Sequence, residues 1–142
     1  MKRLLAGILV ALTMLSSGCT GNQLKFKAYT VVPDGHTALS GTIVFQSKEE
    51  LDLHSEFAGQ AKTYTDEFFK DHILVAASYR EGSYYLSHEV TSVKRNGEIT
   101  IKSRGEGKQI QVETTYSTFI ELERKGVPDH FTVIHEDESS SA

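Results

Sequence analysis

The run from His72 to Tyr79 is apolar almost throughout, and this limits the folds that the chain can adopt. A strand with one face in water alternates apolar and polar residues, whereas a strand buried on both faces is apolar along its length. We therefore expect residues 72–79 to form a central strand that is covered on both sides. The chain has 142 residues, of which 39% are hydrophobic, and this length suits one folded domain.

Alternation of residue types predicts further strands before and after this segment. Leu24, Phe26 and Ala28 alternate with more polar residues, which is the pattern of a strand with one buried face. The other expected strands outside the hairpin described next are residues 41–46, 110–116, 120–122 and 131–134.

A hairpin is predicted around Asn96-Gly97, which separates two segments rich in strand-forming residues, 86–95 and 98–103. Asparagine and glycine both tolerate positive φ angles, and this pair therefore favours a type I′ turn of two residues. The hairpin would place these two segments side by side in antiparallel orientation.

One helix is predicted after the second expected strand. Ser47 and Glu50 form a capping box, in which the Ser47 hydroxyl accepts the Glu50 amide and the Glu50 carboxylate reaches back. Leu53 and Phe57 are four residues apart and would share one helical face, and Gly59 is the expected end. Together these elements predict an α+β fold that is mostly antiparallel β, with about seven strands and one principal helix packed on the sheet.

The N-terminal residues have the pattern of an export signal. Lys2 and Arg3 precede an uncharged apolar run from Leu4 to Leu15. A helix needs about 20 residues to cross the hydrocarbon core, so this run is too short for a permanent anchor. A basic start followed by a short apolar centre is typical of a signal peptide.

Residues 15–19 (LSSGC) resemble a bacterial lipobox, with Ser16 where that family usually has Leu. The resemblance implies cleavage before Cys19 and attachment of a diacylglyceryl group to its thiol. Two or more acyl chains hold a protein stably on a membrane. We therefore expect a signal peptide in residues 1–18 and a tether in residues 19–23. The protein would be anchored by lipid on the extracytoplasmic face of the cell membrane, or on the outer membrane of a host that has one.

The expected mature protein carries an excess of acidic residues. Without residues 1–18 the chain has 124 residues, with 13 Lys and Arg against 19 Asp and Glu, and therefore a net charge of −6. Binding to nucleic acid depends on neutralising phosphates, and binding to anionic lipid by surface charge depends on basic clusters, so this balance argues against both. The single cysteine excludes a disulfide framework within the chain and a zinc cluster built on cysteines.

The region from Asp66 to Phe119 resembles the PrcB-like C-terminal domain family of bacterial exported and lipid-anchored proteins. The resemblance rests on EEL at 49–51, DEFF at 66–69 before ILVAA at 73–77, LSHEVTSV at 86–93, NG at 96–97 and TTYSTF at 114–119. It implies a small, mostly β domain, here residues 24–135, that supports a partner such as an exported protease and performs no chemistry. Residues 136–142 are acidic and rich in serine, and they predict a disordered tail.

The segment from Arg80 to Tyr85 is the first candidate for contact with a protein partner. It is expected to form a loop between two strands, and it holds Arg80, Tyr84 and Tyr85 around a glycine. Arginine and tyrosine dominate binding hot spots because they combine apolar area with hydrogen bonding. The alternative is that one or both tyrosines begin the next strand and pack inward. In the family, a Gly-Gly-rich stretch stands where this chain has GSYY at 82–85.

The alternative function is a small metal- or ligand-binding lipoprotein, or a weak hydrolase, that uses histidines. The six candidates are His36, His54, His72, His88, His130 and His135. His130 and His135 are five apart, and a strand would place them on opposite faces. His88 faces inward in its expected strand, where it is either a pH sensor or a hydrogen-bonded residue without a function. With no Gly-x-Ser-x-Gly motif and no free thiol, we expect no enzymatic activity, no cofactor and no dedicated metal site.

Overall fold

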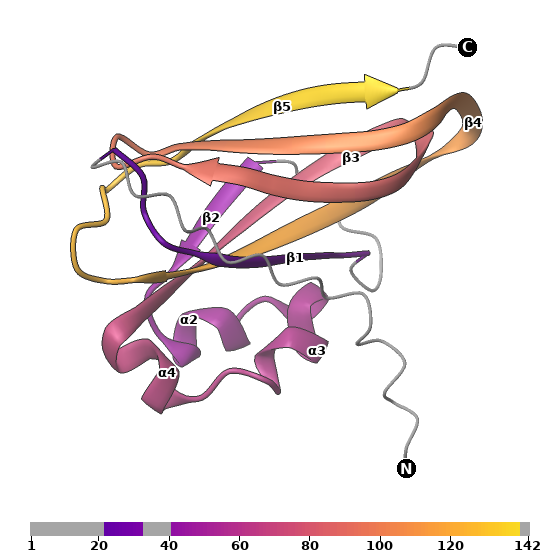
Figure 1. Ribbon diagram of the computed structural model, residues 1–142. Helices are drawn as coiled ribbons and strands as arrows, with labels where there is room; N and C mark the ends of the chain where they lie inside the picture. Colours follow the sequence, from indigo (N-terminus) through magenta and orange to yellow (C-terminus); the bar gives the residue numbers. More distant parts are fainter. Residues whose placement is uncertain (1–21, 33–40, 140–142) are drawn as a thin grey trace.

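The apolar run at His72 begins a strand that is much longer than expected. The computed structural model describes residues 22–32 and 41–139, with the side chains of 81–86, 105–114 and 137–139 outside the description. Strand β3 runs from His72 to Val93, and β4 runs from Glu98 to Glu123. The two strands pair antiparallel along their length (Figure 1).

This long hairpin is irregular in its middle. Glu81 pairs with Thr114 and Ser87 pairs with Arg104, so six steps along β3 oppose ten steps along β4. Extra residues on one strand bend a ladder and increase its twist. Both strands therefore double back, and the described part of the chain forms seven strand segments in two mostly antiparallel sheets.

The first sheet has the order β1, β4, β3, β2, with β1 at Lys27–Val31 and β2 at Gly41–Phe45. It uses the first half of β3 and the second half of β4. The second sheet uses the other halves, together with β5, which runs from Thr132 to Ser139 parallel to β4. The α+β fold with mostly antiparallel strands is confirmed.

Two sequence predictions about loops and ends are wrong. Residues 80–85 were expected to form a loop between two strands, but they lie within the continuous strand β3. Residues 136–139, expected to belong to a disordered tail, extend β5, because they pair with residues 102–105 of β4. Neither pairing was visible in the local residue pattern, since both depend on how distant segments meet.

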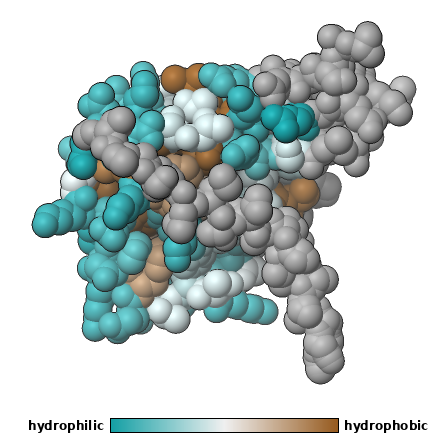
Figure 2. Space-filling model, in the orientation of Figure 1, coloured by the Kyte–Doolittle hydropathy of each residue, from teal (hydrophilic) through white to brown (hydrophobic). Residues whose placement is uncertain are grey.

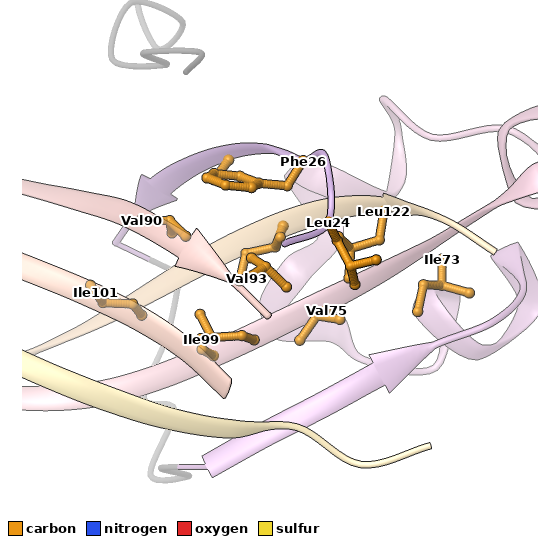
Figure 3. Close-up of a cluster of buried hydrophobic side chains, with 12 residues drawn as sticks. Leu24, Phe26, Ile73, Val75, Val90, Val93, Ile99, Ile101 and Leu122 are labelled. Atoms are coloured by element: carbon orange, nitrogen blue, oxygen red, sulfur yellow. The ribbon is translucent and has the colours of Figure 1, made fainter. Parts of the chain in front are cut away.

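The central strand is covered on both faces, as predicted. Ile73, Val75 and Ala77 point between the two sheets, and Leu74 and Ala76 point toward the helices. Figure 3 shows the core between the sheets, to which both halves of the hairpin contribute. The buried members of this core are Leu24, Phe26, Ala28, Ile73, Val75, Ala77, Val90, Val93, Ile99, Ile101, Ile120 and Leu122.

The helical layer covers the other face of the first sheet (Figure 1). It consists of α2 (Lys48–Asp52), the 3₁₀ helix η1 (Ser55–Phe57), α3 (Ala58–Ala61) and α4 (Asp66–Asp71). These short helices bury a second core against the sheet. Its members are Phe45, Leu51, Phe57, Ala61, Tyr64, Phe69, Leu74, Ala76 and Phe119.

The single principal helix that was predicted is divided into short pieces. Helix α2 ends at Asp52, and the chain turns before η1, so Leu53 and Phe57 do not share a helical face. Phe57 is buried, whereas Leu53 is 79% exposed. The predicted helix start is correct, because the Ser47 hydroxyl accepts the Glu50 amide at 3.1 Å. The Glu50 carboxylate accepts the amide of Gln46 at 2.7 Å, one residue before the helix cap.

The hairpin turn differs in type from the prediction. The Gly97 amide bonds the Lys94 carbonyl at 2.9 Å, so Arg95 and Asn96 are the central residues of the turn. Gly97 follows with a φ of +98°. A turn followed by a glycine with positive φ is the usual form of a three-residue hairpin loop.

Gly97 is also the point at which the segment before β5 meets the hairpin. Its carbonyl accepts the Thr132 amide at 2.9 Å. A Cβ atom at this position would lie 2.1 Å from the carbonyl oxygen of His130. Glycine is therefore required here for both its backbone angle and the close approach of the neighbouring chain.

We predict that Gly97→Ala lowers the free energy of unfolding by on the order of 3 kcal/mol, because it combines a strained φ with a clash against backbone. Gly59→Ala is the matched control, since a Cβ atom at Gly59 in α3 meets nothing within 4 Å. Urea denaturation of both variants is the measurement. Equal midpoints for the two variants would contradict this role of Gly97.

Candidate functional site

Two histidines meet at a buried serine near the bend of the long hairpin. The Ser103 hydroxyl lies 2.8 Å from Nδ1 of His88 and 2.6 Å from Nε2 of His135. The rings of Tyr79 and Tyr116 flank them, with centroids 4.9 Å from His135 and 4.2 Å from His88, respectively. These five residues are named the His88–His135 cluster.

Strand pairing explains why residues so far apart in the sequence meet here. His88 pairs with Ser103, and Tyr79 pairs with Tyr116. His135 pairs with Ile101, two residues from Ser103 on β4. Residues directly opposite each other share a face of the sheet, as do residues two apart in a strand. The inward position of His88 was predicted, whereas the approach of His135 to Ser103 was missed because the expected last strand ended before His135.

Burial sets the protonation of His88. The pKa of His88 is lowered from 6.5 to about 4, mainly by desolvation and secondarily by repulsion from His135. His88 is therefore neutral at pH 7. A serine hydroxyl has one proton to donate and two lone pairs, so it can donate to one neutral imidazole while it accepts from the other.

The geometry favours a structural role for Ser103. Its side chain is fully buried, whereas a nucleophilic serine must reach the carbonyl carbon of a substrate. Instead the hydroxyl joins three strand segments through two hydrogen bonds. The contact with His135 also fixes β5 to the hairpin.

A chain of hydroxyl groups continues from this cluster to β1. The Tyr79 hydroxyl lies 3.0 Å from Oγ1 of Thr118, which lies 2.7 Å from Oγ1 of Thr30. Thr118 is buried, and a buried hydroxyl without such partners would destabilise the fold. These three hydroxyl groups therefore satisfy one another across β1, β3 and β4.

A separate polar group holds the helical layer on the sheet. Tyr64, between α3 and α4, donates to Oε2 of Glu121 at 2.7 Å, and its oxygen lies 2.6 Å from the hydroxyl of Tyr29. Because the Tyr64 proton goes to Glu121, Tyr29 is the donor in the second bond. Burial is the main cause that raises the pKa of Tyr29 to about 12, and it also raises the pKa of Tyr64. Both phenols stay neutral and serve as anchors rather than as acids or bases.

The candidate contact residues lie around the bend. Arg80 is exposed on β3 opposite Thr115. Tyr85 pairs with Gly105 through its backbone, and the side chains of Tyr84 and Tyr85 lie outside the described residues. The predicted lipid attachment residue, Cys19, also lies outside them.

The remaining histidines are scattered. His54 lies 3.3 Å from the carboxylate of Glu56, and His72 lies 2.7 Å from that of Asp71. His130 is exposed, and His36 lies outside the described residues. Within residues 22–32 and 41–139, no group of three or more His, Cys, Asp or Glu side chains is placed to hold a metal ion.

No protein-family model, no curated protein and no solved structure matches this chain. The likeness to the PrcB-like family therefore stays a prediction based on short sequence segments between residues 49 and 119. Among the helices that the structure describes, none has the length and apolar character needed to cross a bilayer.

We predict that the free energy of unfolding falls as pH decreases from about 6.5 to about 4, because the unfolded chain binds a proton at His88 that the folded state resists. The loss is on the order of 2 kcal/mol, allowing for partial exposure of the ring. Urea denaturation at a series of pH values is the measurement.

His88→Gln removes the titrating group, and we expect it to flatten this pH dependence. Ser87→Ala is the matched control, because Ser87 is exposed and precedes His88 on the opposite face of β3. An equally steep dependence in His88→Gln would show that other groups cause it.

Proposed function

We propose that this protein is a lipid-anchored, extracytoplasmic protein-binding module that performs no chemistry. It supports or stabilises a partner protein, such as an exported protease. The observation that carries the proposal is the signal-like N-terminus that ends in the lipobox-like residues 15–19. A diacylglyceryl group on Cys19 would fix the domain at the membrane surface.

The position of the first described residues supports this arrangement. The Asn22 carbonyl accepts the Arg95 amide at 2.8 Å, and Gln23 bridges to Lys94. The last residues of the expected tether are therefore bound to the β3–β4 turn. Two residues separate Cys19 from Asn22, and the three steps between the Cα atoms of Cys19 and Asn22 span at most about 11 Å. The turn would lie close to the bilayer.

The candidate contact residues lie at the other end of the domain. In Figure 1 β3 and β4 double back on the side opposite the β3–β4 turn, and β5 ends on the same side as this bend. Arg80 is next to the bend. An anchored domain would thus present Arg80, Tyr84 and Tyr85 away from the membrane, where a partner is accessible.

The bend also suits a binding surface for a physical reason. Irregular pairing between residues 81–87 and 104–114 interrupts the ladder of backbone hydrogen bonds. Function concentrates on irregular segments that a rigid scaffold holds in place. Here the scaffold is the pair of cores on either side of the first sheet.

The alternative of a metal- or ligand-binding protein or weak hydrolase receives less support. Among the described histidines, His88 and His135 come together, but a buried serine lies between them. A hydrolase would need that hydroxyl to reach a substrate.

The test uses the full chain expressed in its native host. We expect cross-linking in intact cells to capture a defined partner with the wild type. The triple variant Arg80→Ala, Tyr84→Ala, Tyr85→Ala should lose at least about 90% of the captured partner, because such residues carry most of the binding energy at interfaces.

The matched control for this test is Lys62→Ala, Glu67→Ala, Lys70→Ala, which changes three exposed residues of the helical layer. We expect this control to keep the partner. Full capture by the first triple variant, once circular dichroism shows that it is folded, would exclude the proposed surface. Recovery of a Cys19→Ser variant in the membrane fraction at the wild-type level would exclude the anchor.

A further inference from the structure

The end of the domain that holds Asn22 is built from three segments, residues 22–25, 94–98 and 125–130, named here the tether-proximal surface. The first two are joined by the Asn22–Arg95 hydrogen bond. The third lies beside the turn, because a Cβ atom on Gly126 would be 3.2 Å from Nη1 of Arg95. Figure 1 shows these segments at the same end of the molecule.

This surface differs in charge from the rest of the chain. It holds four basic residues, Lys25, Lys94, Arg95 and Lys125, and two acidic residues, Glu98 and Asp129. All four bases are exposed, and the Lys94 ammonium group lies 3.4 Å from the Glu98 carboxylate within this surface. Figure 2, in the orientation of Figure 1, shows mainly hydrophilic residues at this end.

The helical layer has the opposite balance. Residues 47–71 contain three Lys and seven Asp or Glu. Lys48 is also engaged within the layer, since its ammonium group lies 3.1 Å from Asp52 and 2.6 Å from the Ala61 carbonyl. The expected mature chain therefore has a net negative charge overall but a local excess of positive charge near the tether.

We infer that the tether-proximal surface rests on anionic lipid headgroups and thereby orients the domain on the membrane. This inference depends on the anchor of the proposed function. Lysine and arginine are attracted to anionic bilayers only within about one Debye length, roughly 8 Å at physiological ionic strength. Only two residues lie between Cys19 and Asn22, and this short connection keeps the basic side chains near that range.

The lipid surface is the occupant that the geometry favours over an acidic protein. The short tether would place the bilayer at this end of the domain, whereas a protein partner would have to enter between the domain and the membrane. The acidic helical layer is repelled by the same headgroups. Attraction of the tether-proximal surface to the headgroups and repulsion of the helical layer from them would fix the orientation of the domain. The bend and Arg80 would then be directed away from the membrane.

The experiment uses the acylated full-length protein in phosphatidylcholine vesicles, with or without phosphatidylglycerol. Cys19 is the only cysteine, so after acylation a single introduced cysteine can carry a fluorophore. Asn96→Cys reports on the tether-proximal surface, and Ser55→Cys reports on the helical layer. A quencher attached to the lipid headgroup measures the proximity of each label to the membrane.

We expect quenching at position 96 to increase several-fold when phosphatidylglycerol is present and to fall again in high salt. Quenching at position 55 should not increase. Reversing charge with Lys25→Glu, Lys94→Glu and Lys125→Glu should abolish the lipid dependence at position 96. The control Lys27→Glu, Lys62→Glu, Lys70→Glu changes the net charge equally and should preserve it.

Two failures are distinguishable. If the intact mass shows acylated Cys19 but quenching at position 96 does not depend on phosphatidylglycerol, the orientation is overturned and the anchor stands. The orientation is also overturned if both charge-reversal variants behave alike. If the mass shows an unmodified Cys19 in protein from the native host, the anchor of the proposed function fails, and the orientation that depends on it fails as well.

Discussion

The first half of β3 is buried on both faces, and the layers on either side of it are arranged to cover those faces. A single layer could cover only one face of Ile73–Ala77. The helical layer covers one side, and the second half of the hairpin folds back to cover the other. The hairpin can fold back in this way because β4 has extra residues opposite residues 81–87 of β3. It also brings polar side chains into the interior, where the hydroxyl groups of Ser103 and Thr118 are hydrogen-bonded.

The same bend gives the domain two ends with different properties. At one end the β3–β4 turn binds Asn22 and carries an excess of basic residues. At the other end the ladder is irregular, and the His88–His135 cluster fixes β5 next to it. A lipid at Cys19 would make the first end face the membrane and leave the second for a partner. The proposed function and the inferred orientation thus both depend on the placement of the β3–β4 turn and the bend at opposite ends of the domain.

Local patterns in the sequence predicted the elements whose environment depends on nearby residues. The burial of residues 73–77 on both faces and the cap at Ser47 follow from residue spacing and side-chain chemistry. The prediction that Leu53 shares a helical face with Phe57 was wrong, because the helix ends at Asp52, before the next turn can form. The place of His135 beside Ser103 was missed, because it depends on a parallel pairing between β4 and β5 that no local pattern signals. The close approach of His130 to Gly97 also depends on residues that are far apart in the sequence, and no local pattern predicts it.

Native-state hydrogen exchange tests the burial of β3 between two layers, because it measures the protection of each backbone amide. If β3 is held between two layers, the amides of Ile73–Ala77 should exchange only through global unfolding and should be the slowest in the protein. Those of the exposed residues Thr132, Ile134 and Glu136 in β5 should exchange faster. Equal exchange in the two segments, or slower exchange in β5, would contradict a fold organised around the buried half of β3.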